Sequence, residues 1–258
     1  MESCFFKGGN DMPRYKAVIA YDGTDYCGFQ TQDNGKTVQQ ELEKTLTKFN
    51  NGVYVPIHGS GRTDSGVHAE GQVIHFDMPQ ERDEEKLRHA FDTQSPEDIA
   101  VKSVELVDDE FHARYLAKGK TYHFYVDIGR PRSPFSRRYA AFFPYDLDIE
   151  KMQEAAELLL GEHDFSGFCA TGTEIEDKVR TVYEAKVEQV SETQLRFVFS
   201  GNGFLYKMVR IMVGTLLKIG NNRMPVEQIT TIIEKKDRNL AGPTAHPEGL
   251  YLMEVRYK

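Results

Sequence analysis

The residues best suited to chemistry lie in one glycine-rich segment, Gly59-Ser60-Gly61-Arg62-Thr63-Asp64-Ser65-Gly66-Val67-His68-Ala69. Its three glycines within eight residues permit positive φ angles and the close approach of a ligand. Arg62 and Asp64 stand two residues apart among small neighbours. Such a loop offers a carboxylate without shielding it and places a cation nearby to control its ionisation. From these residues alone, an active-site carboxylate and an ordinary glycine-rich turn both remain open.

Other kinds of site fit this segment less well. A phosphate-binding loop requires the pattern G-x-x-x-x-G-K-[ST], and the lysine is missing. An EF-hand requires further oxygen ligands at alternating positions and a glutamate at the twelfth. A serine nucleophile, Ser60 or Ser65, would need a histidine base, and the segment has no G-x-S-x-G elbow. A metal site could be imagined from four residues that match no standard ligand spacing, which are His58, Asp64, His68 and His75. We therefore expect no metal.

The composition is that of a globular protein. The chain has 258 residues, of which 40% are hydrophobic and 28% charged, and this length allows one or two domains. No apolar run approaches the ~20 residues of a membrane span, so we expect no membrane association. Residues 1–11 contain no apolar core of a signal peptide. Because Met12 is a second plausible start, we expect residues 1–12 to be an N-terminal extension outside the fold.

The cysteines argue for a reducing compartment. The chain has three, Cys4, Cys27 and Cys169, with no C-x-x-C pair. An odd number without that spacing is not typical of a disulfide scaffold or a zinc finger. We therefore expect a cytoplasmic protein.

The charges are segregated along the chain. A net charge of −8, taken alone, argues against a nucleic-acid partner. Yet residues 114–140 hold seven bases and one acid, residues 200–223 hold four bases and no acid, and residues 77–110 are strongly acidic. Segregation of this kind can give an acidic protein a basic face. Charge alone leaves open both nucleic-acid binding and separate solvated surfaces.

The elements that must position the glycine-rich segment are strands interspersed with helices. Runs of β-branched and aromatic residues predict strands over residues 15–22, 53–58, 73–77, 99–107, 121–128, 139–143, 179–190, 195–200 and 250–257. A capping box, Thr37-Val38-Gln39-Gln40, predicts a helix start, and further helices are expected over residues 150–160 and from Pro225 to about residue 234. Several strands are polar on one face, which favours antiparallel sheets covered by helices on the other.

A weak internal echo indicates two similar halves. Residues 25–29 read DYCGF and residues 164–168 read DFSGF. We therefore expect an α+β fold of two similar domains, each a largely antiparallel sheet with helices on one face. The predicted domains are residues 13–110, which carry the glycine-rich segment, and residues 111–258.

One further helix is expected over residues 204–219. The run is apolar nearly all round, which is typical of a buried helix. Lys207, Arg210 and Lys218 nevertheless share one stripe of it. Lysines near helix ends can extend to solvent, but an arginine in the middle cannot do so easily. We therefore expect Arg210 to face a cleft.

Residues 61–69 resemble the catalytic motif of the tRNA pseudouridine synthase A family. The resemblance extends in order over essentially residues 13–258, with the matching segments at 21–24, 28–30, 39–42, 111–114, 120–122, 163–166, 203–210 and 241–245. Residues 91–96 and the pair His246-Pro247 depart from the family pattern, and neither touches the catalytic motif.

The resemblance implies a tRNA-uridine isomerase of pseudouridine synthase-like fold, with its active-site cleft between the two domains. Such an enzyme converts uridine to pseudouridine at positions 38, 39 and 40, in the anticodon stem and loop of tRNA, and needs no metal or small-molecule cofactor. Asp64 matches the essential carboxylate of the family, Arg210 the arginine that pairs with it, and Tyr122 the active-site tyrosine. The family also implies a homodimer with a basic cleft across both subunits.

The residues expected to bind RNA are mostly basic. They are Arg62, Tyr122, Lys207, Arg114, Arg137 and Arg138. The expected partner is the anticodon arm of tRNA. Two alternatives stay open, a non-catalytic RNA-binding module and a metal-dependent hydrolase.

Overall fold

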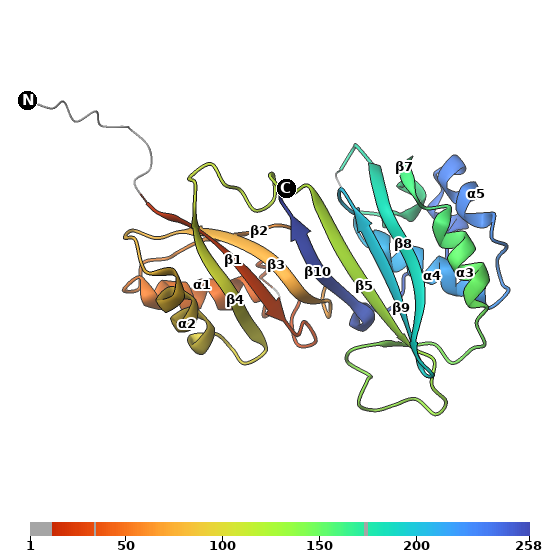
Figure 1. The fold of residues 1–258 in the computed structure, drawn as a ribbon, viewed down its shortest axis with the longest axis horizontal. Coiled ribbons are helices and arrows are strands. Elements are labelled where there is room, and N and C mark those ends of the chain that lie inside the picture. The colour runs from red at the N-terminus through yellow and green to blue at the C-terminus, as the bar shows by residue number, and fades with distance from the viewer. Residues whose placement is uncertain (1–11, 34, 173–174) are drawn as a thin grey trace, which may run out of the picture.

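The computed structural model describes residues 12–33, 35–172 and 175–258 (Figure 1). Its strands are β1 (Arg14–Tyr21), β2 (Ile57–Gly59), β3 (His68–Asp77), β4 (Ile99–Val107), β5 (Gly119–Asp127), β6 (Ala141–Phe142), β7 (Gly161–Asp164), β8 (Val179–Ser191), β9 (Gln194–Gly201) and β10 (Leu250–Arg256). Its helices are α1 (Val38–Phe49), α2 (Glu84–Gln94), α3 (Ile149–Glu157), α4 (Met208–Gly220) and α5 (Gln228–Lys235). The expected N-terminal extension lies outside the described residues except for Met12.

The strands form one continuous sheet with the order β4-β1-β3-β10-β5-β9-β8-β7, with β2 on β3 and β6 on β5. The ladders are antiparallel except that β10 runs parallel to β3 and β6 runs parallel to β5. The expected α+β fold is confirmed, and the sheets of the two halves are joined through β10, which pairs with both β3 and β5. The proposed domain boundary at residues 110/111 falls in the connection between β4 and β5 and stays a prediction.

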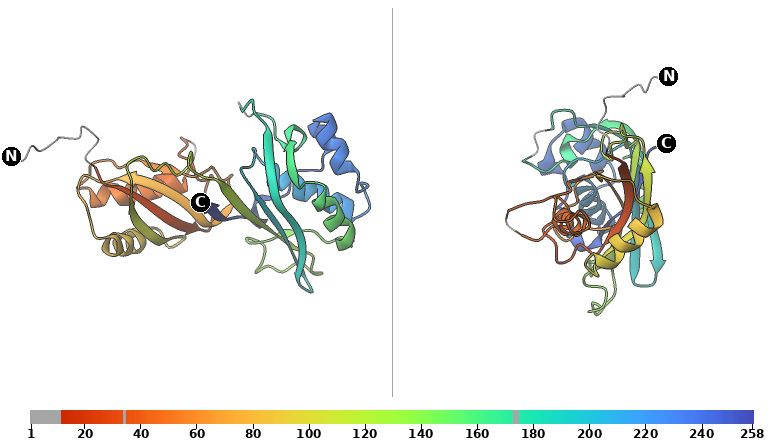
Figure 2. Two further views of the ribbon diagram at one scale, coloured as in Figure 1. Left: turned by 45° about the horizontal axis from the view of Figure 1, so that its top comes forward. Right: turned by 90° about the vertical axis from the view of Figure 1, so that its left-hand side faces the viewer.

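Helices cover the sheet in both halves. Figure 2 shows α1 and α4 on the same side of the sheet. On β5 the side chains of Tyr122, Phe124 and Val126 are buried and alternate with less buried ones, as a strand with one covered face requires. Opposite them, Phe197 and Phe199 of β9 are fully buried. The face of β5 that carries Tyr122 therefore belongs to the core.

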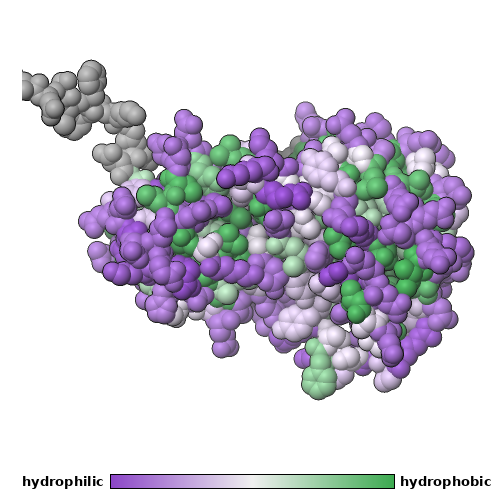
Figure 3. Space-filling model, in the orientation of Figure 1, coloured by the Kyte–Doolittle hydropathy of each residue, from purple (hydrophilic) through white to green (hydrophobic). Residues whose placement is uncertain are grey.

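The outer surface is mostly polar. Figure 3 shows hydrophilic side chains spread over one face of both halves, with apolar groups in small separate patches. Among the described residues, no helix has the length and apolar character needed to cross a membrane.

Several element boundaries differ from the sequence prediction. The capping box at Thr37 is present and opens α1. Helix α2 was not predicted, because it buries only Leu87 and Phe91 and is otherwise charged. The predicted strand 53–58 is reduced to β2 because Pro56 supplies no backbone donor for a sheet, and the predicted strand 139–143 is reduced to β6. Helices α3 and α5 cover less than their predicted ranges.

Helix α4 begins four residues later than predicted. Lys207 has a φ of 58° and caps the helix in a left-handed conformation, so the chain cannot be helical from residue 204. Arg210 therefore lies in the first turn of α4 and not in its middle, which corrects the expectation from the apolar pattern.

Helix α4 is seated tightly against the segment 241–245. Gly214 lies so close to this segment that a Cβ atom placed on it would stand 1.7 Å from the carbonyl oxygen of Pro243. One residue further, the hydroxyl of Thr215 accepts a hydrogen bond of 2.9 Å from the backbone N–H of Gly242. These backbone contacts set the position of α4.

We expect Gly214→Ala to destabilise the protein by about 3 kcal/mol, because the methyl group would overpack a backbone contact that cannot yield. Urea unfolding measures the change. Gly203→Ala is the matched control, since the nearest atom to its Cβ would be a side-chain nitrogen at 3.5 Å. Equal stability of the two variants would contradict the tight seating of α4.

Candidate active site

The loop that carries Asp64 connects β2 to β3 and is held by the segment 22–29. The backbone N–H of Phe29 donates to the carbonyl of Thr63 at 3.2 Å, and the hydroxyl of Ser65 donates to the carbonyl of Tyr26 at 3.1 Å. Between these contacts, Gly28 has a φ of 97°, and a Cβ on it would lie 2.7 Å from the carbonyl oxygen of Thr63. Only glycine fits this approach, so the loop and the segment 22–29 form one packed unit.

An ion pair joins this loop to the other half of the chain. Nη1 of Arg210 donates to a carboxylate oxygen of Asp64 at 2.7 Å, and the two side chains are only 12% and 24% exposed. Nε of Arg210 donates to the carbonyl of Ala245 at 2.7 Å, and the N–H of Ala245 returns a bond of 3.0 Å to the carbonyl of Arg210. The guanidinium is thus fixed at both ends, and it directs one N–H at the carboxylate.

The position of Arg210 in the first turn of α4 has an electrostatic consequence. The N-terminal end of a helix carries partial positive charge, which disfavours a cation and favours an anion nearby. A carboxylate bound to a first-turn arginine offsets that conflict.

Tyr122 lies beside this pair on the covered face of β5. Its ring packs edge-on against Phe204 at 5.2 Å between centroids. Burial raises the pKa of the Tyr122 phenol, and the neighbouring Tyr21 and the charge of Asp64 raise it further. The hydroxyl of Tyr122 therefore stays protonated at neutral pH. Tyr21, whose pKa burial raises to about 12, shares a hydrogen bond of 2.8 Å with the hydroxyl of Thr63.

Lys120 also contacts the loop, and the sequence analysis did not include it among the site residues. Its Nζ donates to the carbonyl of Ser60 at 2.9 Å. Burial, together with the smaller effect of the Arg114 charge, lowers the pKa of Lys120 to about 8. The signal that could have found it is the two-residue spacing from Tyr122, which puts both side chains on one face of β5.

Two of the expected RNA-binding residues near the loop differ in exposure, since Arg62 is exposed and Lys207 is half-buried. Arg62 is exposed on the loop itself, and no hydrogen bond or ion pair of its side chain involves a described residue. Lys207 stands at the start of α4 with its Nζ 4.8 Å from the centre of the Tyr206 ring. Arg62 can therefore reach a bound ligand without giving up a partner within the described chain, whereas Lys207 would exchange its contact with the Tyr206 ring for one with the ligand.

The basic segment 114–140 does not form one patch. Arg114 precedes β5, whereas Arg137 and Arg138 follow it in the segment 128–140, which we call the arginine loop. Nine residues of extended strand span roughly 30 Å, so the two groups lie at opposite ends of β5. Arg138 reaches back to Asp25 at 3.5 Å, which places the arginine loop beside the segment 22–29 that holds the loop of Asp64.

The four residues considered as metal ligands do not lie together at one site. His58 and His75 stack at 4.8 Å between ring centroids, whereas His68 lies 3.2 Å from Asp22 and stacks on Tyr251. Asp64 is engaged by Arg210. In the described ranges, no three histidine, cysteine or acidic side chains are grouped to hold a metal ion. The geometry gives the metal-dependent hydrolase no ligand set.

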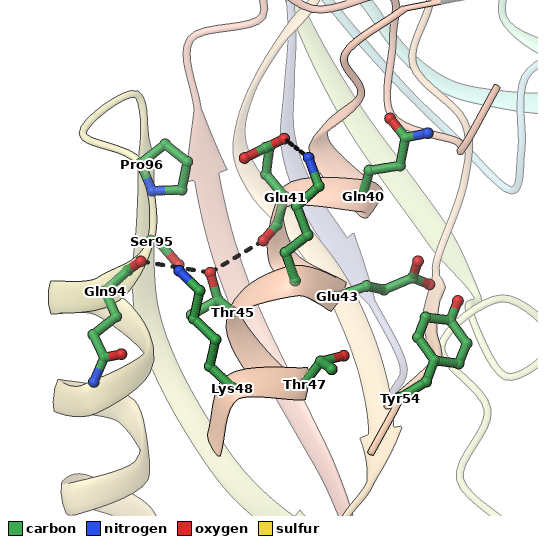
Figure 4. Close-up of a pocket in the computed structure, with 11 residues that line it drawn as sticks. Gln40, Glu41, Glu43, Thr45, Thr47, Lys48, Tyr54, Gln94, Ser95 and Pro96 are labelled. Carbon is green, nitrogen blue, oxygen red and sulfur yellow. Dashed lines mark hydrogen bonds and ion pairs between the residues drawn. The ribbon is translucent and has the colours of Figure 1, made fainter. Parts of the chain in front are cut away.

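Two surface cavities lie elsewhere. Figure 4 shows side chains of α1, residues 94–96 and Tyr54 around a cavity of about 750 Å³. A second, of about 390 Å³, is lined by residues that include Asp22, His68 and Tyr139. Asp64 lines neither cavity, so the chemical centre is defined by the ion pair between the two halves.

Comparison with known proteins identifies the family of the chain. The family described as tRNA pseudouridine synthase matches residues 17–116 and 155–258, and the chain belongs to this family of isomerases, which convert uridine to pseudouridine. Among its relatives, tRNA pseudouridine synthase A of Streptococcus pneumoniae (strain Hungary19A-6) is 64% identical over 249 residues, which cover 96% of this chain and 100% of the relative. The protein of the same name from serotype 2 (strain D39 / NCTC 7466) matches equally. The expected family and isomerase class are confirmed.

Solved structures show a more distant likeness. The archaeal box H/ACA sRNP Nop10-Cbf5 complex matches with a TM-score of 0.35 and 12% identity, over 88% of this chain and 60% of that chain. A Cbf5-Nop10-Gar1 complex matches with a TM-score of 0.34 and 11% identity, over 78% of this chain and 54% of that chain. A likeness at this level carries no argument about the site.

We expect the pKa of Lys120 to appear in the pH dependence of stability. Its value is about 8 in the folded protein and 10.5 ordinarily, so the unfolded chain binds more protons at this residue between those pH values. The free energy of unfolding must then rise with pH in this window. The difference between wild type and Lys120→Met should change by on the order of 2 kcal/mol from pH 8 to pH 10.

Urea unfolding of both proteins over this range measures that change, and the titration of the tyrosines cancels in the difference. Lys118→Met, at an exposed lysine two residues earlier, controls for the loss of a surface lysine. A pH-independent difference between wild type and Lys120→Met would show that Lys120 titrates at its ordinary value.

Proposed function

We propose that the chain isomerises uridine to pseudouridine at positions 38, 39 and 40, in the anticodon stem and loop of tRNA. Asp64 is the essential catalytic carboxylate. The observation that carries this proposal is the ion pair of Asp64 with Arg210, which places a charged, partly exposed carboxylate between the two halves of a member of the family. The reaction breaks the N1–C1′ glycosidic bond, turns the uracil and rejoins it to the ribose through C5.

Each side chain at the centre has a role that its contacts support. Asp64 acts on the ribose side of the glycosidic bond as nucleophile or base. Arg210 holds this carboxylate in one orientation through its bonds to Asp64 and Ala245. Tyr122 offers a ring face for the uracil and a protonated hydroxyl for proton transfer at C5. Removal of Arg210 would leave a partly buried charge without its partner.

The uridine must leave the helical stack before Asp64 can reach its sugar. Extrusion of a base costs a few kcal/mol. Contacts with the extruded nucleotide can offset this cost, and Arg62 on the loop and Lys207 at the start of α4 can make them. Recognition by backbone and shape suits an enzyme that accepts neighbouring positions, because phosphate contacts carry no sequence information.

The proposed assembly is a cytoplasmic homodimer that binds the anticodon arm. Arg114 lies at one end of β5, and Arg137 and Arg138 lie at the other, so one subunit offers two separate basic surfaces. When two subunits pair, each of these basic surfaces would become part of a longer basic surface that binds one tRNA. The free thiols of Cys27 and Cys169 support a reducing compartment. No metal or small-molecule cofactor enters the proposed reaction.

We expect Asp64→Asn to abolish pseudouridine formation in an anticodon stem-loop RNA with uridine at position 39, assayed with chelator present. Binding of tRNA should stay within about tenfold of wild type, because it rests on phosphate contacts. The control is Asp146→Asn, since Asp146 is fully exposed and forms an ion pair with Arg130 at the surface, and such pairs contribute little.

Three outcomes would contradict this proposal. Turnover by Asp64→Asn would remove the carboxylate from the mechanism. Binding of tRNA without product formation by wild type would favour an RNA-binding module. Product formation that stops on addition of chelator would favour a metal-dependent reaction.

A further inference from the structure

The arginine loop presents one apolar ring to solvent. Phe135 is 88% exposed, the highest exposure among the large hydrophobic side chains of the described residues. A single exposed apolar residue needs no explanation by itself. The surroundings of Phe135 set it apart, because the loop holds four arginines and no acid.

The ends of the arginine loop are fixed. The buried carboxylate of Asp127 accepts hydrogen bonds from the N–H of Gly129 at 2.8 Å and from the hydroxyl of Ser136 at 2.6 Å. Near the far end, the hydroxyl of Tyr139 donates to Asp22 at 2.8 Å. Phe135 therefore projects from an anchored loop, and Figure 1 shows the chain after β5 extending away from the sheet at its lower edge.

The arginine loop also contacts residues that are close to the loop of Asp64. A ring nitrogen of His68 lies 2.9 Å from the carbonyl oxygen of Arg138, and His68 is four residues after Asp64. Arg138 in turn contacts Asp25. Phe135 is three residues from Arg138 along the chain, and three residues span at most about 10 Å, so its ring lies near the contact between the arginine loop and His68.

Part of the positive charge of the loop is unpaired. Arg130 pairs with Asp146 and Arg138 with Asp25. Within the described part of the chain, Arg132 and Arg137 have no acidic partner: Arg132 lies over the ring of Phe142, and Arg137 donates to the carbonyl of Pro134. The loop thus combines an exposed aromatic ring with free guanidinium groups.

This combination fits unpaired RNA. Proteins bind single-stranded nucleic acid with aromatic rings on which bases stack and with cations that follow the backbone. A second copy of the chain fits less well, because symmetric contact would bring the same arginines together. A base inside a stem is already stacked, whereas the bases of a loop are available.

We propose that Phe135 stacks on an unpaired base of the RNA while Arg132 and Arg137 bind the phosphates beside it. The inference rests on the proposed function and identifies the part of the substrate that this surface recognises. Phe135 thus binds the anticodon loop, and it does so from the side of the site on which the arginine loop lies.

The chain contains no tryptophan, so Phe135→Trp introduces a single fluorescent reporter. We expect the emission of this variant to fall by about half or more when an anticodon stem-loop RNA binds, because the base covers the indole. Tyr183→Trp, at an exposed position of β8, is the matched control and should change little. If the fluorescence of Phe135→Trp does not change when RNA is added, the proposal is overturned.

Measurements of RNA affinity distinguish the contribution of base stacking on Phe135 from that of the arginine charges. Phe135→Leu keeps an apolar side chain but lacks a ring, so we expect about tenfold weaker binding of the stem-loop with an unchanged salt slope. Arg137→Ala should instead reduce the slope of log affinity against log salt by about 0.7 to 0.9. Neither Phe135→Leu nor Phe135→Trp should alter binding of a blunt duplex of the same stem.

The outcomes distinguish this inference from the proposed function. If wild type forms pseudouridine and Phe135→Leu binds the stem-loop as tightly as wild type, the stacking role alone is wrong. If wild type neither binds nor modifies the RNA, the proposed function fails first. If the emission of Phe135→Trp shifts on dilution of the protein without RNA, the ring contacts a second copy, and the proposal is overturned.

Discussion

The structure depends on one charged contact, the pair of Asp64 and Arg210. The two residues come from different halves of the chain, and neither half alone can provide both. The pair requires that the first turn of α4 reach the loop between β2 and β3. Backbone contacts secure this reach, since Gly214 lies against Pro243 and Ala245 exchanges hydrogen bonds with Arg210. Breaking such a pair from one side costs roughly 3–5 kcal/mol when it is buried.

The loop of Asp64 is supported on the other sides as well. Segment 22–29 packs against it from within its own half, and Lys120 and Tyr122 approach it from β5. Because side chains two residues apart on a strand share one face, a single strand supplies a cation and a phenol to the same side of the sheet. The carboxylate is thereby placed by rigid elements although it sits on a loop, which is what precise chemistry requires.

Sequence reasoning succeeded where a local pattern determines the structure. The capping box at Thr37 opens α1, and the strands predicted over residues 121–128 and 195–200 correspond to β5 and β9. Prediction from the sequence failed where a single backbone angle or the order of strands determines the structure. Lys207 has a left-handed backbone conformation, so α4 starts later than predicted. The pattern of apolar residues gives no indication of such a conformation. The position of Lys120 against Ser60 depends on which strands are neighbours, and the split of the basic segment depends on the length of β5. The resemblance supplied the family, and the roles of Asp64, Tyr122 and Arg210 stay predictions.

Strand β10 sits between β3 and β5 although it follows all the other strands in the chain. On a ribosome, β3 and β5 are therefore made long before the strand that joins them, and each leaves an unpaired edge while it waits. Open edges of this kind invite pairing with other chains. The segment 241–245, which orients Arg210, is made just before β10. The ion pair of Asp64 with Arg210 is thus among the last contacts that a nascent chain can complete, and a chain that still lacks β10 leaves open edges for association.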